Sequence, residues 1–90
     1  MRNERDASDL LLYHGPTCPY CRKVLDAAAA LKIDLPLKDA WANEATMGEL
    51  KAGGGRYTVP CLRITQPDGS FRWMYESDDI VAYLRSRFGR

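Results

Sequence analysis

The alternation of apolar and polar positions divides the first half of the chain into two predicted strands and a helix. Leu10–Tyr13 is a continuous apolar run, which is typical of a strand covered on both faces. Apolar residues then recur at three- and four-residue spacing through residues 19–31, which predicts a helix. Residues 33–37 alternate and predict a short strand. Because Pro36 has no N–H group, this strand is expected at a sheet edge or a bulge.

The middle of the chain predicts a second helix followed by a hairpin. Asn43 is expected to cap a helix that continues to about Lys51, and glycines 53–55 are expected to end it. Residues 60–65 and the alternating aromatic residues of 71–75 then predict two strands. The turn between them, at 66–69, contains an Asp-Gly pair that favours a hairpin.

A last helix is predicted after Ser77, which is expected to be its cap. Its apolar stripe consists of Ile80, Tyr83, Leu84 and Phe88. The predicted order is therefore β-α-β-α-β-β-α. Because the first three strands alternate with helices, they require crossover connections and a parallel pair, and the final hairpin adds antiparallel edges. The sequence predicts an α/β fold with a mixed four-stranded sheet and three helices.

Composition limits the class of protein. Ninety residues are enough for one domain, and we expect residues 1–8 to form a flexible tail and residues 9–90 a single domain. Thirteen basic and twelve acidic residues give a net charge of +1, which argues against nucleic acid or an anionic membrane as a partner. No stretch approaches the roughly 20 apolar residues of a membrane span. The charged start lacks the apolar segment of a secretory signal. An odd number of cysteines favours a reducing compartment, so we expect a cytoplasmic protein.

Two thiols stand at the predicted start of the first helix, in Cys18-Pro19-Tyr20-Cys21. Proline suits the first helical position, so Cys18 is expected where the free N–H groups and the dipole of the helix converge. This environment stabilises a thiolate, which is the nucleophilic form of cysteine. Cys21 lies one turn deeper and is expected to be more buried. The spacing therefore predicts that Cys18 attacks a disulfide and that Cys21 resolves the product.

The same pair could instead form half of a structural zinc site, completed by Cys61 and His14. We expect no metal, because the pair opens a helix beside a buried strand, whereas zinc ligands usually come from irregular loops. Cys61 is expected to be a small buried hydrophobic residue, with a mixed disulfide or a metal as the alternatives. His14 could act as a base, although a thiol activated by a helix needs none.

The two motifs Cys18-Pro19-Tyr20-Cys21 and Thr58-Val59-Pro60 resemble those of glutaredoxins. The order of elements resembles the thioredoxin fold, and the similarity covers about residues 9–88. The resemblance implies a glutathione-dependent thiol–disulfide oxidoreductase. Such an enzyme is expected to be a monomer that uses glutathione as co-substrate. Its partners would be glutathionylated or disulfide-containing proteins.

The resemblance also implies a glutathione site formed by residues from three segments. These residues are Tyr20, Arg56, Val59, Pro60, Glu76, Ser77 and Asp78. Val59 would present its backbone to the cysteine of the tripeptide, next to a cis bond at Pro60. Arg56 would face the glycine carboxylate. The γ-glutamyl end would meet the N-terminus of the last helix, where free N–H groups bind a carboxylate.

The chain departs from glutaredoxins at two places. Gly15 stands where many glutaredoxins have a lysine, and Tyr75-Glu76 replaces a Gly-Gly pair. Glu76-Ser77 instead resembles the N-terminal domain of glutathione transferases, in which the Glu-Ser pair grips the γ-glutamyl group. The alternative function is a [2Fe–2S] cluster held by glutathione and the thiols across a dimer. Pro19 and Tyr20 argue against it, because cluster carriers more often have other residues there.

Overall fold

The computed structural model describes residues 7–42, 44–56 and 58–89. The elements occur in the predicted order: β1 (Leu10–His14), α1 (Pro19–Ala30), β2 (Leu37–Asp39), α2 (Glu44–Gly54), β3 (Cys61–Thr65), β4 (Phe71–Met74) and α3 (Ser77–Phe88). The predicted βαβαββα thioredoxin fold is therefore confirmed. Among the described residues, no helix has both the length and the apolar character that crossing a bilayer requires.

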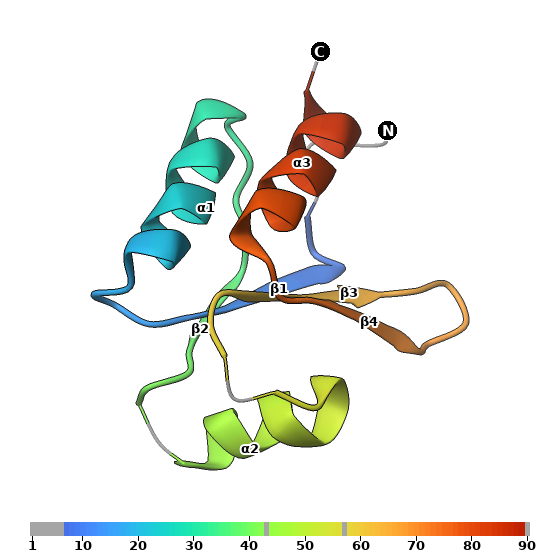
Figure 1. Ribbon diagram of the computed structural model, residues 1–90. Helices are drawn as coiled ribbons and strands as arrows, with labels where there is room; N and C mark the ends of the chain where they lie inside the picture. The colour runs from blue at the N-terminus through green and yellow to red at the C-terminus, as the bar shows by residue number, and fades with distance from the viewer. Residues whose placement is uncertain (1–6, 43, 57, 90) are drawn as a thin grey trace.

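The four strands form one sheet in the order β2-β1-β3-β4. β1 and β2 are parallel, whereas β3 pairs antiparallel with both β1 and β4, so the predicted mixed sheet is confirmed. Figure 1 shows α1 and α3 side by side on one face of this sheet and α2 on the other. The molecule therefore has three layers, with the sheet in the middle.

The two faces of the sheet carry cores of different size. The face under α1 and α3 is mainly aliphatic and includes Leu12, Val24 and Leu84, each fully buried. The face under α2 has a smaller cluster of Tyr13, Ala40, Leu50 and Cys61. A polar contact supplements this smaller cluster, because the Tyr13 hydroxyl donates to a Glu49 carboxylate oxygen at 2.9 Å.

The second strand lies later in the chain than predicted. The alternation of residues 33–37 comes from Ile33 and Leu35, which are buried in the core without pairing in the sheet. The backbone N–H of Leu12 donates to the Pro36 carbonyl at 2.9 Å, and the ladder begins at Leu37. Because Pro36 cannot donate to a ladder, the strand starts after it. The prediction of an edge position is confirmed.

The second helix is longer than predicted and continues through Gly54. Both Gly53 and Gly54 are needed for close approach, because a Cβ atom at these positions would overlap the side chains of Trp73 and Tyr75. Gly55 has φ +89° and ends the helix, as is common for glycine at this position. The predicted cap, Asn43, lies outside the described residues.

Two boundaries differ from the sequence predictions. The cap of α3 is Glu76, and Ser77 is the first helical residue, so the prediction of Ser77 as the cap was wrong by one position. At the other end of the chain, Ala7 is buried in the core and its carbonyl accepts from the Leu10 N–H at 2.9 Å. The packed structure therefore includes Ala7, which lies within the segment expected to be a tail.

Candidate functional site

The thiol pair lies where β1 leads into α1. Cys18 is the N-cap of α1, with φ −79° and ψ 120°, and Pro19 follows at the first helical position. The Cys18 N–H donates to the Gly15 carbonyl at 3.1 Å, and the Cys18 carbonyl accepts from the Arg22 N–H at 3.0 Å. Cys18 is partly exposed, whereas Cys21 is 1% exposed. The predicted difference in burial between the two thiols is confirmed.

The environment of Cys21 keeps its sulfur protonated at neutral pH. Burial is the largest cause and raises the pKa of Cys21 to about 11. The Gly15 N–H donates to the Cys21 sulfur at 3.4 Å, which opposes this increase, whereas a hydrogen bond with Cys18 and the charge of Cys18 raise the pKa further. Cys21 is therefore a neutral thiol beneath the accessible sulfur of Cys18.

The Val59–Pro60 peptide bond is cis, as predicted. Tyr13 on β1 is paired with Cys61 on β3, so the antiparallel register places Pro60 opposite the end of β1. The turn to Cys18 begins at that same end of β1. The fold therefore brings the proline loop and the thiol pair to the same end of the two central strands, β1 and β3.

The other two candidate reactive residues, Cys61 and His14, do not form a cluster of metal ligands with the thiol pair among the described residues. Cys61 is fully buried in the cluster under α2, and burial raises its pKa to about 11, so its interpretation as a small buried residue is confirmed. The His14 Nδ1 atom is buried without a hydrogen-bond partner in the described part of the chain. Within that part, no three or more His, Cys, Asp or Glu residues gather as a metal site.

Arg56 and Glu76 lie next to each other. Arg56 Nη2 is 3.8 Å from Glu76 Oε2, and both side chains are mostly exposed. The Arg56 guanidinium also lies over the ring of Tyr75, at 4.9 Å from its centroid. Two residues expected at opposite ends of a bound tripeptide therefore share one location.

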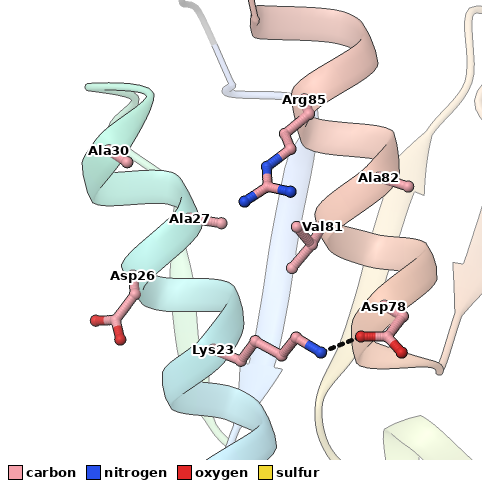
Figure 2. A pocket seen from close by; sticks show the side chains of 8 residues that line it. All are labelled: Lys23, Asp26, Ala27, Ala30, Asp78, Val81, Ala82 and Arg85. Atoms are coloured by element: carbon pink, nitrogen blue, oxygen red, sulfur yellow. Dashed lines mark hydrogen bonds and ion pairs between the residues drawn. The ribbon is translucent and has the colours of Figure 1, made fainter.

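Asp78 faces α1. Its carboxylate pairs with Lys23 across a groove of about 460 Å³ between α1 and α3 (Figure 2). Tyr20 lies in the first turn of α1 and is 64% exposed. The structure therefore places Asp78 beside α1, and it brings Glu76 toward Arg56 instead.

Residues 12–90 match the family model described as glutathione S-transferase, N-terminal domain. The chain belongs to this family. Its match covers most of the chain, and it agrees with the interpretation of Glu76-Ser77 as a transferase-like pair. The family match supports a thioredoxin-fold domain of the glutathione transferase type and not specifically a glutaredoxin.

Solved structures of glutathione transferases have the same fold. A delta-class enzyme from Nilaparvata lugens is 30% identical with a TM-score of 0.72, and the match covers 90% of this chain and 37% of that one. A Bombyx mori transferase is 26% identical with a TM-score of 0.73, over 90% and 36% of the two chains. A trimeric transferase from Leishmania is 31% identical with a TM-score of 0.70, over 87% and 16%. No curated protein shows significant similarity. The chain thus spans about a third or less of these transferases.

Two residues near the site were not among the predicted site residues. The Trp41 indole packs on Gly15, where a Cβ atom would overlap it, in the turn that precedes Cys18. Tyr75 supports Arg56. Both are marked in the sequence by the departures from glutaredoxins, because the unexpected Gly15 makes room for Trp41 and the unexpected Tyr75 replaces a glycine.

Proposed function

We propose that the chain is a glutathione-dependent thiol–disulfide oxidoreductase that reduces protein–glutathione mixed disulfides and protein disulfides. The observation that carries this proposal is the asymmetry of the thiol pair. Cys18 is partly exposed at the start of a helix, and the buried Cys21 keeps its proton. Helix N-termini in general favour anions, and on this ground we assign the attack to Cys18 and the resolving role to Cys21.

In the first step, the Cys18 thiolate attacks the glutathione sulfur of a mixed disulfide. A new S–S bond forms between Cys18 and glutathione, and the bond between glutathione and the protein breaks. The released protein thiolate takes a proton from solvent. The protein substrate is reduced, and Cys18 is oxidised to its glutathione adduct.

The adduct is resolved by one of two nucleophiles. The thiolate of a second glutathione attacks the bound glutathione sulfur, which releases glutathione disulfide and restores the Cys18 thiolate. Alternatively Cys21 loses its proton and attacks the Cys18 sulfur, which forms an internal disulfide and releases reduced glutathione. The raised pKa of Cys21 favours the first route at neutral pH, because little of Cys21 is then ionised.

Family membership supports glutathione as the ligand. We propose that the Val59 backbone, beside the cis bond at Pro60, binds the cysteine of the tripeptide. The N-terminus of α3, with Glu76 and Ser77, binds its γ-glutamyl end. We further propose a monomer that works in the reducing cytoplasm, which suits the three free cysteines.

Serine variants of the two active-site cysteines test the proposal. Cys18→Ser should abolish turnover of a glutathionylated peptide in a glutathione-coupled assay. Cys21→Ser should keep that activity and lose the reduction of a protein disulfide, which needs a second sulfur on the enzyme. Equal loss of peptide deglutathionylation in both variants would contradict this division of roles.

The family match also favours a second candidate, the transfer of glutathione to an electrophile. In that reaction the thiolate that attacks belongs to glutathione, so Cys18 is not consumed in a disulfide. Conjugation of 1-chloro-2,4-dinitrobenzene that persists in Cys18→Ser, without deglutathionylation by the wild type, would select this candidate.

A further inference from the structure

The indole of Trp41 lies on the backbone of Gly15, at the start of the turn that leads to the thiol pair. Gly15 is buried, and a Cβ atom there would overlap the indole. Trp41 itself is 49% exposed, so one part of its ring covers Gly15 while the rest faces solvent. The contact therefore depends on the absence of a side chain at position 15.

The backbone of Gly15 is hydrogen-bonded to both active-site cysteines. Its carbonyl accepts from the Cys18 N–H at 3.1 Å, and its N–H donates to the buried Cys21 sulfur at 3.4 Å. A donor of this kind binds a thiolate more strongly than a thiol, because charge strengthens a hydrogen bond. Among the described influences on the pKa of Cys21, this hydrogen bond lowers it, whereas burial and Cys18 raise it.

The end of the sheet fixes Trp41 relative to Gly15. The backbone N–H of Trp41 donates to the Asp39 Oδ1 atom at 2.9 Å, at the end of β2. The Ala40 N–H donates to the His14 carbonyl at 2.8 Å, at the end of β1. Because His14 directly precedes Gly15, the indole and the glycine are attached to two paired strand ends.

We propose, resting on the proposed function, that Trp41 is a positioning residue for the resolving thiol. Its indole holds Gly15 in place, so that the Gly15 N–H stays directed at the Cys21 sulfur while this sulfur reacts. In this step Cys21 gives its proton to solvent, and its thiolate attacks the Cys18 sulfur. The bond between the two cysteines forms, the bond from Cys18 to glutathione breaks, and glutathione leaves as a thiolate that takes a proton. Trp41 thus influences how much of the adduct Cys21 resolves and how much a second glutathione resolves.

The midpoint of Cys21 ionisation tests the inference without any substrate. NMR of cysteine labelled with carbon-13 at Cβ, in a Cys18→Ser background, follows Cys21 and Cys61 in one sample between pH 8 and 12. Trp41→Ala should raise the Cys21 midpoint by about 0.5–1 pH unit, which is part of what a hydrogen bond to a charged group is worth. The midpoint of Cys61, in the cluster under α2, should stay unchanged.

The sign of the shift separates positioning from other roles of the indole. If Trp41 only shielded Cys21 from water, its truncation would lower the midpoint toward the ordinary value of 9.0, because burial is the main cause that raises it. A general loss of structure would lower the midpoints of Cys21 and Cys61 together. Either of these results, or an unchanged midpoint of Cys21, would overturn the inference.

A double-mutant cycle tests whether the contact with Gly15 carries the effect. Gly15→Ala places a methyl group in the indole and should raise the Cys21 midpoint, without backbone strain, because Gly15 has no positive φ. In the double variant with Trp41→Ala the methyl group has room, so the two shifts should sum to less than their separate values. Fully additive shifts would overturn the inference.

Two further variants serve as rescue and control. Trp41→Phe keeps an aromatic ring beside Gly15 and should recover at least half of the shift caused by Trp41→Ala. Phe71→Ala is the matched control, because Phe71 lies on β4 with an exposure of 47%, close to that of Trp41. This variant should leave the midpoint of Cys21 unchanged, and an equal increase in it would contradict a specific role of Trp41.

The consequence for the reaction is measured on protein whose Cys18 carries glutathione. Mass spectrometry follows the loss of glutathione as the internal disulfide forms at pH 7. A higher pKa reduces the thiolate fraction but increases the nucleophilicity of each thiolate, so Trp41→Ala should slow this step about two- to fourfold. An unchanged or faster step would overturn the inference. Failure of the proposed function differs, because the wild type would then not turn over a glutathionylated peptide while the Cys21 midpoint still responded to Trp41→Ala.

Discussion

Replacement of Cys18 by serine should leave a protein with no thiol that reacts at neutral pH. The two remaining cysteines, Cys21 and Cys61, are buried, with exposures of 1% and 0%. Only a thiolate reacts with an alkylating agent at an appreciable rate. The experiment therefore tests whether Cys18 is the only thiol of the folded protein that an alkylating agent modifies at neutral pH.

The magnitude follows from the pKa values of the buried thiols. Burial is the main cause that raises the pKa of both Cys21 and Cys61 from the ordinary value of 9.0 to about 11. At pH 7.5 this reduces the thiolate fraction about 100-fold relative to an ordinary cysteine. The variant loses the hydrogen bond and charge of Cys18, but burial, the largest cause, remains. Alkylation should therefore proceed at no more than about 1% of the rate of a free cysteine.

The assay is alkylation with iodoacetamide between pH 6 and 10, followed by mass spectrometry of the peptides. Cys21→Ser is the matched control, because it removes a buried thiol and should keep one fast-reacting site at Cys18. Both variants should alkylate fully in 8 M urea. If Cys21 or Cys61 in folded Cys18→Ser reacted like a free cysteine with a midpoint near pH 9, the argument from burial would be refuted.

Two further results are expected. Cys21 and Cys61 keep their protons in the folded state at pH values where the unfolded chain loses them. The free energy of unfolding should therefore be constant below about pH 9 and should fall between pH 9 and 11, by roughly 1 kcal/mol per pH unit for each thiol. A melting temperature that stays constant from pH 8 to 11 would contradict this. In α2, the new methyl group of Gly48→Ala meets open space, so this variant should be more stable by about 0.5–1 kcal/mol. The methyl group of Gly53→Ala would overlap the Trp73 indole, so that variant should be less stable. Urea unfolding measures both, and an increase in stability for both variants would contradict the contact between Gly53 and Trp73.

The parts of the fold that the sequence predicted correctly are those with strong local patterns. Val24 and Ala28 are one helical turn apart in α1, as are Ile80 and Leu84 in α3, and all four are buried. The Asp-Gly pair at 68–69 lies in the turn between β3 and β4, with Gly69 at φ +89°. In these segments each residue type favours the conformation that the whole fold requires, so local evidence was sufficient.

The end of α2 could not be predicted in this way. Glycine costs about 1 kcal/mol in a helix, so Gly53 and Gly54 locally favour termination. The structure keeps them helical because Trp73 and Tyr75, about 20 residues later, pack against their bare backbone. Such a contact between distant segments leaves no periodic pattern in the sequence.

The candidate site, too, could be predicted only where its residues lie close together in the sequence. The roles suggested for Cys18 and Cys21 came from a short motif at a helix start, and the structure has the expected difference in their burial. The neighbourhood of Arg56 and Glu76 joins positions 20 residues apart through the aromatic ring between them. Neither charge pattern nor spacing indicates it, because exposed charges have no period that a core would impose.

The unequal cores on the two faces of the sheet imply that the three layers separate at different free energies. α2 buries only Thr46 and Leu50 among its described side chains, whereas α3 buries Ile80, Val81 and other apolar residues against α1 and the strands. Amide hydrogens of α2 should therefore exchange with solvent through a partial opening that leaves the opposite layer closed. Each such opening would release the chain around Arg56, just after α2, while the helix that begins after Cys18 stays folded, so the two ends of the candidate site would belong to separately stable parts of one small domain.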